Sequence, residues 1–311
     1  MNPNPRTPPF ARRLGRGLVA FVWLALNTAP VSPAGACSVC QCGDPTYRLL
    51  GDDVFGDRSW HLSLDMDHLG KDQIAEDFPS GRETENEKRL TGSAAWSPVP
   101  RVRLVGRLPV AWRSIEDPAG TQSLFGFSDP DLYAHVDVFR RERSSASWTA
   151  VMVGVKTAWG QSDRTLEGTR ADEHLQPGSG AASLFAGLSG SVAGNTSSHL
   201  YASAMGRWNG ENAHRYRYGD VVMANLAYRR GLSRGVSASG ELNFRASEKD
   251  RNGDELDPNT GGTVLYVTPK LSIRMTGPMV LRLGVQVPVY QNLFGDQNEH
   301  VNLQTGVTVT Y

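Results

Sequence analysis

The last twelve residues of this chain, His300 to Tyr311, alternate between polar and mostly apolar side chains. Successive side chains of a β-strand point to opposite faces, so this segment is predicted to be a strand with one apolar and one polar face. A strand of a soluble β-sandwich gives this pattern, and so does a strand whose apolar face meets lipid. The apolar face carries Val301, Leu303, Thr305, Val307, Val309 and Tyr311.

The same alternation recurs from Ser59 onward and gives about twelve predicted strands. Single-chain barrels of the bacterial outer membrane have an even number of antiparallel strands, which agrees with this count. Pairing of the first strand with the last would leave no unbonded backbone edge in lipid. The predicted strands are centred on residues 60–67, 90–96, 102–112, 132–138, 149–157, 184–192, 200–208, 220–228, 236–244, 265–273, 279–289 and 300–311.

The predicted connections alternate in length, which a β-sandwich has no reason to produce. Outer-membrane barrels have long extracellular loops and short periplasmic turns. The long connections are about 69–85, 114–129, 158–181, 209–219, 247–261 and 291–299, and the short ones are 97–100, 141–146, 194–198, 230–234 and 276–278. We therefore predict an all-β fold, a transmembrane antiparallel up-and-down β-barrel of about 12 strands with a short N-terminal periplasmic segment.

Composition agrees with a barrel. Hydrophobic residues make up 39% of the 311 residues, and no apolar run after the N-terminus reaches the roughly 18 residues that a membrane helix needs. In a barrel only every second residue has to face lipid. The 32 basic and 32 acidic residues balance, so charge gives no argument for nucleic-acid binding.

The N-terminus is predicted to be a signal peptide, residues 1–36. Arginines between Arg6 and Arg16 precede a short apolar stretch at 17–26, and Ala34-Gly35-Ala36 resembles a cleavage site. The apolar stretch is too short for an inner-membrane anchor. We expect Sec-type export to the outer membrane of a Gram-negative bacterium. The mature chain would then comprise a periplasmic segment at 37–58, which could plug the barrel, and the barrel at 59–311.

The three cysteines of the chain, Cys37, Cys40 and Cys42, lie within six residues. Thiolates at this spacing can converge on a soft metal ion such as copper, iron or zinc. In an exported protein the alternative is a disulfide, which leaves one cysteine over unless cleavage before Cys37 yields a lipoprotein. Both interpretations stay open, so the predicted cofactor is at most a metal ion at these cysteines.

If the apolar face of each strand is outward, the polar face lines a lumen, and several arginines share it. Rings of Arg or Lys favour anionic solutes in pores. Alternatively, these charges pair across strands and stiffen a narrow barrel, because charges inside it need partners or water. The predicted lumen-lining residues are Arg101, Arg103, Arg107, Arg113, Arg207, Glu241, Arg245, Lys270 and Arg282, and the same face also carries Arg229 and Arg274.

Two further patterns bear on ligands and catalysis. Residues 250–257 place acidic and amide side chains at alternate positions, as calcium loops do, but Glu255 stands where such loops have glycine. A solvated acidic loop is the simpler interpretation, and bound calcium there would bridge lipopolysaccharide. We find no G-x-S-x-G, H-E-x-x-H or nucleotide-binding motif, and we expect no enzymatic activity.

Four segments resemble motifs of one protein family: 126–132 (GFSDPDL), 154–157 (GVKT), 174–180 (HLQPGSG) and 261–269 (GGTVLYVTP). This family is the group of outer-membrane transporters named for the meta-pathway of phenol degradation, related to transporters of fatty acids and aromatic hydrocarbons. The resemblance implies a pore or transporter and names no solute. The C-terminal strand also resembles the signal that barrel-assembly machinery recognises, an alternating segment ending in an aromatic residue.

These patterns support two functional hypotheses. The first is an outer-membrane channel, porin-like, that passes small solutes through a charged lumen. The second is a non-conducting barrel that anchors the cysteine-containing segment 37–58, which would bind a metal or a partner. In both cases the expected partners are outer-membrane lipid, lipopolysaccharide and the assembly machinery.

Overall fold

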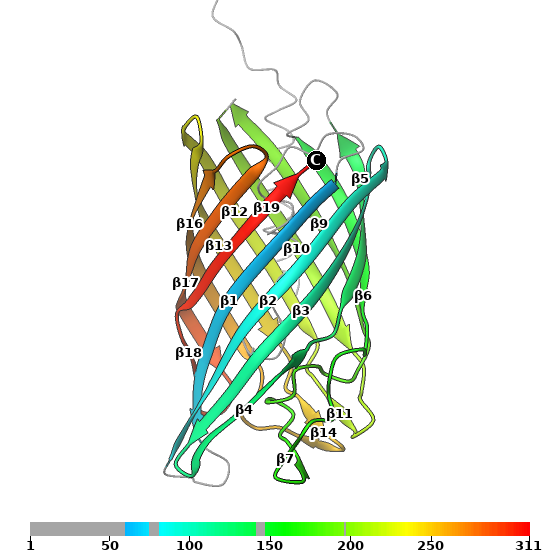
Figure 1. The fold of residues 1–311 in the computed structure, drawn as a ribbon, viewed down its shortest axis with the longest axis vertical. Coiled ribbons are helices and arrows are strands. Elements are labelled where there is room, and N and C mark those ends of the chain that lie inside the picture. The colour runs from blue at the N-terminus through cyan, green and yellow to red at the C-terminus, as the bar shows by residue number, and fades with distance from the viewer. Residues whose placement is uncertain (1–59, 75–80, 141–146, 196) are drawn as a thin grey trace, which may run out of the picture. The chain divides into compact units, whose positions relative to one another are not determined.

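The wall of the molecule is one closed antiparallel sheet (Figure 1). The computed structural model describes residues 60–311 apart from 75–80, 141–146 and 196. Within these residues each wall strand pairs with its neighbours along the chain, and the last strand pairs with the first. The wall strands are β1 (Trp60–Ile74), β2 (Arg82–Val99), β3 (Val102–Asp117), β5 (Asp131–Arg140), β6 (Trp148–Lys156), β9 (Ser183–Asn195), β10 (Ser198–Asn209), β12 (Val221–Ser233), β13 (Val236–Ser247), β16 (Gly262–Arg274), β17 (Met279–Leu293) and β19 (Asn302–Thr310).

These are the twelve strands that the alternation predicts, and the predicted fold class is confirmed. The described residues contain no helix that is long and apolar enough to span a membrane. The predicted segments 1–36 and 37–58, with the three cysteines, lie outside the described residues.

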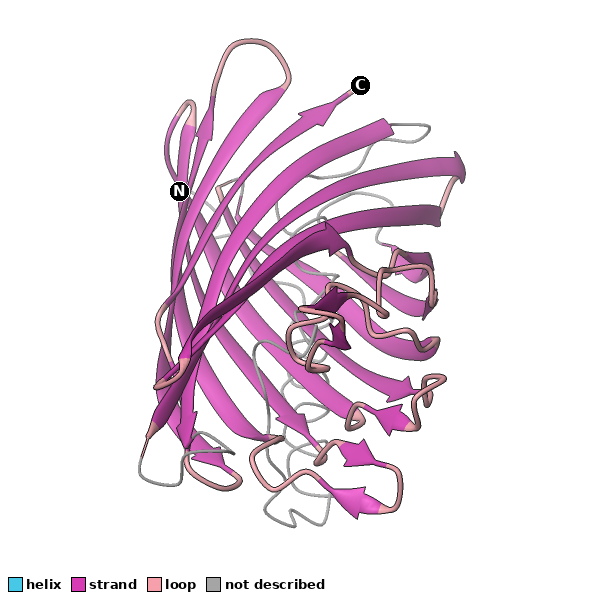
Figure 2. Ribbon diagram, turned by 60° about the horizontal axis from the view of Figure 1, so that its bottom comes forward, coloured by secondary structure: helices cyan, strands magenta, loops and turns pink. Residues whose placement is uncertain are grey.

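The two ends of the barrel differ, as the connection lengths predict. One end, here called the turn end, carries turns such as 100–101 and 234–235 and the last strand's end near Tyr311. The opposite loop end carries the long connections and the short strands, brought forward in Figure 2. These are β4 (Gly120–Phe127), β7 (Thr165–Leu166), β8 (Thr169–Arg170), β11 (Tyr216–Arg217), β14 (Arg251–Asn252), β15 (Glu255–Leu256) and β18 (Gln297–Glu299).

The predicted loops 69–85 and 114–129 are largely wrong. Strands β1 and β2 stay paired as far as Ile74 and Arg82, and β4 pairs with the end of β3. Their side chains alternate less clearly between apolar and polar because these extensions lie beyond the apolar part of the wall, so the pattern did not mark them as strands.

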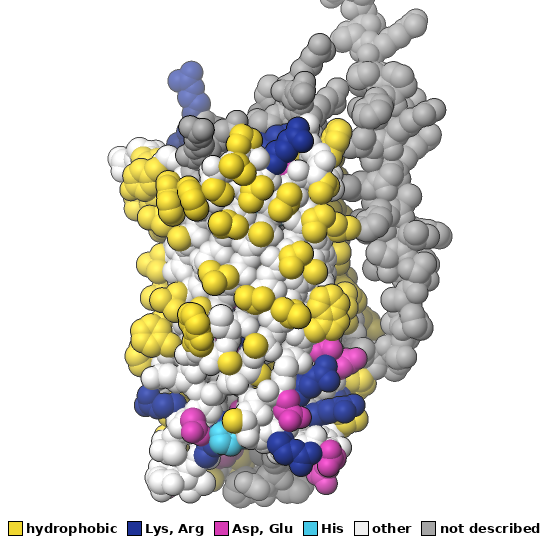
Figure 3. All heavy atoms as spheres, turned by 90° about the vertical axis from the view of Figure 1, so that its right-hand side faces the viewer, with side chains coloured by type: hydrophobic (Ala, Val, Ile, Leu, Met, Phe, Trp, Pro, Cys, Tyr) yellow, Lys and Arg dark blue, Asp and Glu magenta, His cyan; other side chains and the backbone are white. Residues whose placement is uncertain are grey.

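The outer face of the wall is apolar. Leu62, Leu64 and Met66 of β1 are 42–53% exposed, whereas the residues between them, such as His61 and Asp65, are buried inside. Figure 3 shows apolar side chains over the middle of one side of the wall, with most of the charged side chains toward the loop end and a few basic ones at the turn end. Aromatic pairs stand near both ends of the wall: Trp60 stacks on Trp96, and Trp112 lies against Phe125.

The inner face is largely polar, and one half of it also carries an apolar band. Consecutive wall strands from β2 to β12 each contribute at least one buried apolar residue to a continuous band. The remaining strands, β13, β16, β17, β19 and β1, carry mainly polar and charged residues on their inner faces. The apolar band consists of Ala95, Val105, Tyr133, Met152, Phe185, Met205 and Met223, joined at its loop-end side by Val221, Tyr216 and Tyr218.

The closing strand leaves space for an ion pair that crosses it. Arg282 of β17 donates a 2.7 Å hydrogen bond to Asp65 of β1, although β19 lies between these two strands. The residue of β19 at this level is Gly306, which pairs with both Asp65 and Arg282 in the strand register. A Cβ atom at Gly306 would collide with the Asp65 carboxylate, and Ser63 also holds that carboxylate through a 2.9 Å hydrogen bond.

We expect Gly306→Val to destabilise the barrel by breaking this ion pair. Breaking a buried pair costs on the order of 3 kcal/mol, so the variant should lose its folded, fast-migrating gel band at a lower temperature than wild type. Gly240→Val is the control, because Gly240 is exposed and a Cβ there meets nothing within 4 Å. Equal melting of the two variants would contradict the role assigned to Gly306.

Candidate functional site

A buried segment of chain occupies the loop end of the barrel. Residues 171–181, here called the mouth loop, belong to the connection between β6 and β9. Most of the segment is buried although it contains no regular structure: Leu175 and Gln176 are 0% exposed. Leu175 packs with Leu124 of β4 and Ala171. The side-chain amide of Gln176 donates to the carbonyls of Arg164 and Ala171, so the loop also folds on itself.

The mouth loop is held from several sides through its backbone. Arg113 of β3 donates a 3.0 Å hydrogen bond to the carbonyl of His174, and Ser128 donates one of 2.6 Å to the carbonyl of Pro177. From the connection between β10 and β12, Tyr218 donates a 3.0 Å hydrogen bond to the carbonyl of Glu173. These partners come from one wall strand and from two connections that are well separated along the chain, so the loop extends across the mouth.

Asp129 fixes the end of the mouth loop that leads into β9. Its carboxylate accepts hydrogen bonds of 2.7 Å from the Ser179 backbone N–H and 2.6 Å from the Ser179 hydroxyl. Lys156, at the end of β6, lies 3.2 Å from the same oxygen. The other carboxylate oxygen accepts from the Gly160 backbone N–H. One buried carboxylate thereby organises both ends of the β6–β9 connection.

The His174 ring joins two sets of charged residues. Its Nδ1 atom lies 3.4 Å from Glu85 of β2, and Glu85 forms a 2.7 Å ion pair with Lys71 of β1. On the other side, His174 Nε2 lies 2.9 Å from the Tyr216 hydroxyl, which donates a 3.0 Å hydrogen bond to Asp250. The ring therefore links the β1–β2 wall to the connections that follow β10 and β13.

This environment makes His174 a cation. Burial alone would lower the pKa of His174, but the carboxylates of Glu85 and Asp257 outweigh it and raise the pKa well above 6.5. Burial also opposes the charge on Asp257, yet its attraction to His174 leaves the Asp257 pKa below the usual value. Burial raises the pKa of Asp250. At neutral pH the mouth loop thus carries a positive charge between acidic groups.

Most of the predicted lumen residues lie on inner faces of the wall. Arg103 is 5% exposed, and the guanidinium of Arg207 lies 5.6 Å from the centre of the Phe185 ring. Arg101 does not share this row: it lies exposed in the turn after β2, with a φ of 73°. The strand alternation that predicted its direction ends before it.

Many of the inward cations face carboxylates. The pairs are Arg107–Asp131 at 3.6 Å, Arg113–Glu87 at 3.0 Å, Lys270–Glu241 at 2.8 Å, Arg282–Asp65 at 2.7 Å and Arg245–Glu299. This is the cross-strand pairing that the sequence left open as the alternative to a basic lumen. Whether these residues form a solute path stays a prediction.

The sequence did not single out His174 or Lys71 as site residues. The run 174–180 stood out only as a resemblance to a family loop. An apolar Leu175 inside a polar connection was the remaining signal that this loop is buried. The acidic run 250–257 is not simply solvated, because Asp250 is 3% exposed and accepts hydrogen bonds from Gly219 and Tyr216.

Metal ligation can be judged only in part. Among residues 60–311, with the gaps given above, no group of three or more His, Cys, Asp and Glu side chains is arranged to hold a metal ion. Cys37, Cys40 and Cys42 lie outside the described residues, so their predicted metal or disulfide stays a prediction.

Comparison with known proteins supports the architecture. No protein-family model matches the sequence, and no curated protein matches it either. The fold is similar to that of an outer membrane channel from Pseudomonas putida F1, with a TM-score of 0.65, 11% sequence identity, and coverage of 83% of this chain and 97% of that one. The translocator domain of the autotransporter NalP from Neisseria meningitidis is also similar, with a TM-score of 0.53, 12% identity, and coverage of 83% and 90%. The resemblance to the phenol-degradation family remains unconfirmed.

We expect rising pH to release the mouth loop. The folded-state pKa of His174 is raised, so its stabilising effect is complete below 6.5 and is lost as the pH rises through the raised value. Trypsin should then cut faster at Arg164 and Arg170 of the same connection. His174→Gln should be cut at least about tenfold faster than wild type at neutral pH, because it leaves buried charges unpartnered.

Cleavage is measured by mass spectrometry of the refolded barrel, with variants compared at equal pH. The control is His300→Gln, because His300 is partly exposed and its 3.0 Å contact is with Asp72 of β1, outside the β6–β9 connection. If wild type and His174→Gln are cut at the same rate at neutral pH, His174 does not hold the loop.

Proposed function

We propose that this protein is a channel in the outer membrane of a Gram-negative bacterium, passing small solutes through a charged lumen. The observation that carries the proposal is the wall itself. It is a closed sheet with exposed apolar residues outside, such as Leu62, and charged residues inside, such as Asp65. Closure of the sheet pairs the backbone N–H and C=O groups that would otherwise lack hydrogen bonds in hydrocarbon, and the apolar outer face is suited to lipid. The similarity in fold to an outer membrane channel is consistent with this function.

The spacing of the aromatic pairs supports a membrane-spanning wall. Trp96 pairs in register with Leu104 of β3, and Trp112 lies eight residues further along the same strand. Eight residues of antiparallel strand extend about 27 Å, which a tilt of about 40° reduces to about 21 Å. This is close to the apolar band of about 25 Å in outer-membrane barrels. The two aromatic pairs would then lie at the two lipid–water interfaces.

One observation favours the second candidate, a barrel that does not conduct. The mouth loop is buried and tied to the wall by Arg113, Ser128 and Tyr218. A permanently filled mouth would make the barrel an anchor for the segment 37–58. A loop that opens would make it a gated channel, and we prefer this proposal because the contacts of His174 depend on its protonation.

We expect replacement of residues 172–178 by a Gly-Ser linker of equal length to enlarge the conductance in planar bilayers several-fold. The replacement removes the side chains of His174, Leu175 and Gln176, which hold the loop in the mouth, so the loop is no longer fixed there. The control replaces residues 252–255, at the exposed tip between β14 and β15, and should conduct as wild type does. If neither the wild type nor the 172–178 variant conducts although both are correctly folded, the result would favour the non-conducting barrel that anchors segment 37–58.

We expect the loop end to face the outside of the cell. In a background with Cys37, Cys40 and Cys42 replaced by Ser, Asp254→Cys should react with a membrane-impermeant maleimide on intact cells, because Asp254 is 94% exposed at the loop end. Arg234→Cys, exposed at the turn end, should react only after the outer membrane is opened. The reverse pattern would overturn the orientation.

A further inference from the structure

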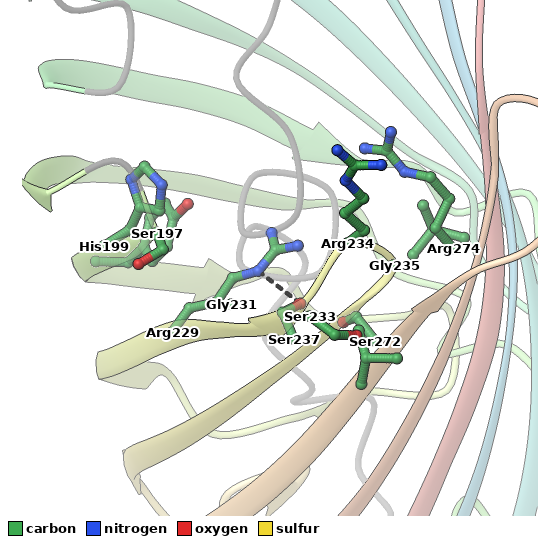
Figure 4. A pocket seen from close by; sticks show the side chains of 13 residues that line it. Ser197, His199, Arg229, Gly231, Ser233, Arg234, Gly235, Ser237, Ser272 and Arg274 are labelled. Atoms are coloured by element: carbon green, nitrogen blue, oxygen red, sulfur yellow. Dashed lines mark hydrogen bonds between the residues drawn. The ribbon is translucent and has the colours of Figure 1, made fainter.

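A cavity of about 410 Å³ opens at the turn end of the barrel (Figure 4). It lies against the ends of β10, β12, β13, β16 and β17, between the turns at Ser197, at 234–235 and after Arg274. Its volume is in the range of roughly 300–1,000 Å³ that is usual for small-molecule sites. It is far along the chain from the mouth loop and shares no residue with it.

Three arginines and no acidic residue line the cavity. Arg229, Arg234 and Arg274 contribute to its wall together with the imidazole of His199. This contrasts with the inner face a few residues further into the barrel. There Lys270, on the same strand as Arg274, is paired with a carboxylate of β13.

Arg234 and Arg274 are held close together by the backbone. The N–H of Arg274 donates a 2.6 Å hydrogen bond to the carbonyl of Gly235, so the two arginines stand on adjacent turns. Figure 4 shows both side chains extending in the same direction from their turns. Within the described part of the chain, neither side chain forms an ion pair or a side-chain hydrogen bond. Two neighbouring guanidinium groups repel each other unless an anion lies between them.

The rest of the wall supplies a framework and further hydrogen-bond donors. Arg229 Nε donates a 3.0 Å hydrogen bond to the Ser237 hydroxyl, which holds this arginine against β13. The hydroxyls of Ser233 and Ser272 also border the cavity. The planar N–H fork of a guanidinium matches the two oxygens of a carboxylate or phosphate, and several such groups can engage one ligand with more than one oxyanion.

We propose that this cavity binds small organic anions carrying two or more oxyanion groups, carboxylate or phosphate. The inference rests on the proposed function in one respect: in a channel, this site would hold the solute at the turn-end opening. Binding itself requires only the cavity and its arginines.

The test is calorimetric titration of the refolded full-length protein in detergent at low salt, with citrate and pyrophosphate as probes. Citrate carries carboxylate groups and pyrophosphate carries phosphate groups, so comparing their affinities shows which of the two groups the cavity prefers. Arg234→Gln with Arg274→Gln should weaken binding of the preferred probe at least about tenfold, because charge-assisted hydrogen bonds are lost. The matched control is Arg101→Gln with Arg230→Gln, which removes the same charge from exposed arginines outside the cavity and should change affinity less than about twofold.

Failure of the site and failure of the channel are separable, because binding is measured without conduction. Probe binding that depends on Arg234 and Arg274 in a silent barrel supports the site and refutes the channel. Conduction without probe binding in wild type refutes the site alone. Equal losses in the double variant and in its control also overturn the proposal, since they would reflect overall charge.

Discussion

The pairing of β1 with β19 is the contact on which the rest of the structure depends. It runs in register from His61 opposite Thr310 to His68 opposite Leu303, and backbone hydrogen bonds between Trp60 and Tyr311 extend it to the end of the chain. Without this seam both strands would present open edges, which are unstable in hydrocarbon and prone to pair with other chains. The register of this seam also fixes which side chains point into the barrel, since a shift by one residue would exchange the inner and outer faces.

The interior follows from that closure. A barrel of this strand number is intermediate between packed and open barrels, so inward side chains reach across several strands. Asp65 and Arg282 meet over Gly306, and Tyr133 and Phe185 lie against each other over Gly154. In each case glycine on the intervening strand provides the space. The glycines are therefore part of the interior's chemistry, because the larger side chains beside them could not meet otherwise.

The sequence predicted the wall well and the mouth poorly, for physical reasons. A wall strand has a lipid-facing apolar residue at every second position, so its pattern is local and visible. The mouth loop has no period, and its burial depends on partners such as Arg113 and Asp129 that are remote in the sequence. The alternation of side chains along each strand correctly predicted that the arginines point inward, except at Arg101, where the strand has ended. The alternation within one strand cannot predict which carboxylate each arginine faces, because those pairs join different strands.

The distribution of charge inside the barrel limits where selectivity can arise. On the polar half, Lys270 and Arg282 each face a carboxylate at less than 3 Å, and such a pair has little net field at a distance. The opposite half combines the apolar band around Phe185 and Met205 with ion pairs such as Arg113–Glu87. At the loop end the cationic His174 lies among carboxylates that compensate it. At the turn end, by contrast, Arg234 and Arg274 line a cavity that has no acidic lining residue, so a preference for anions would be set at least in part there.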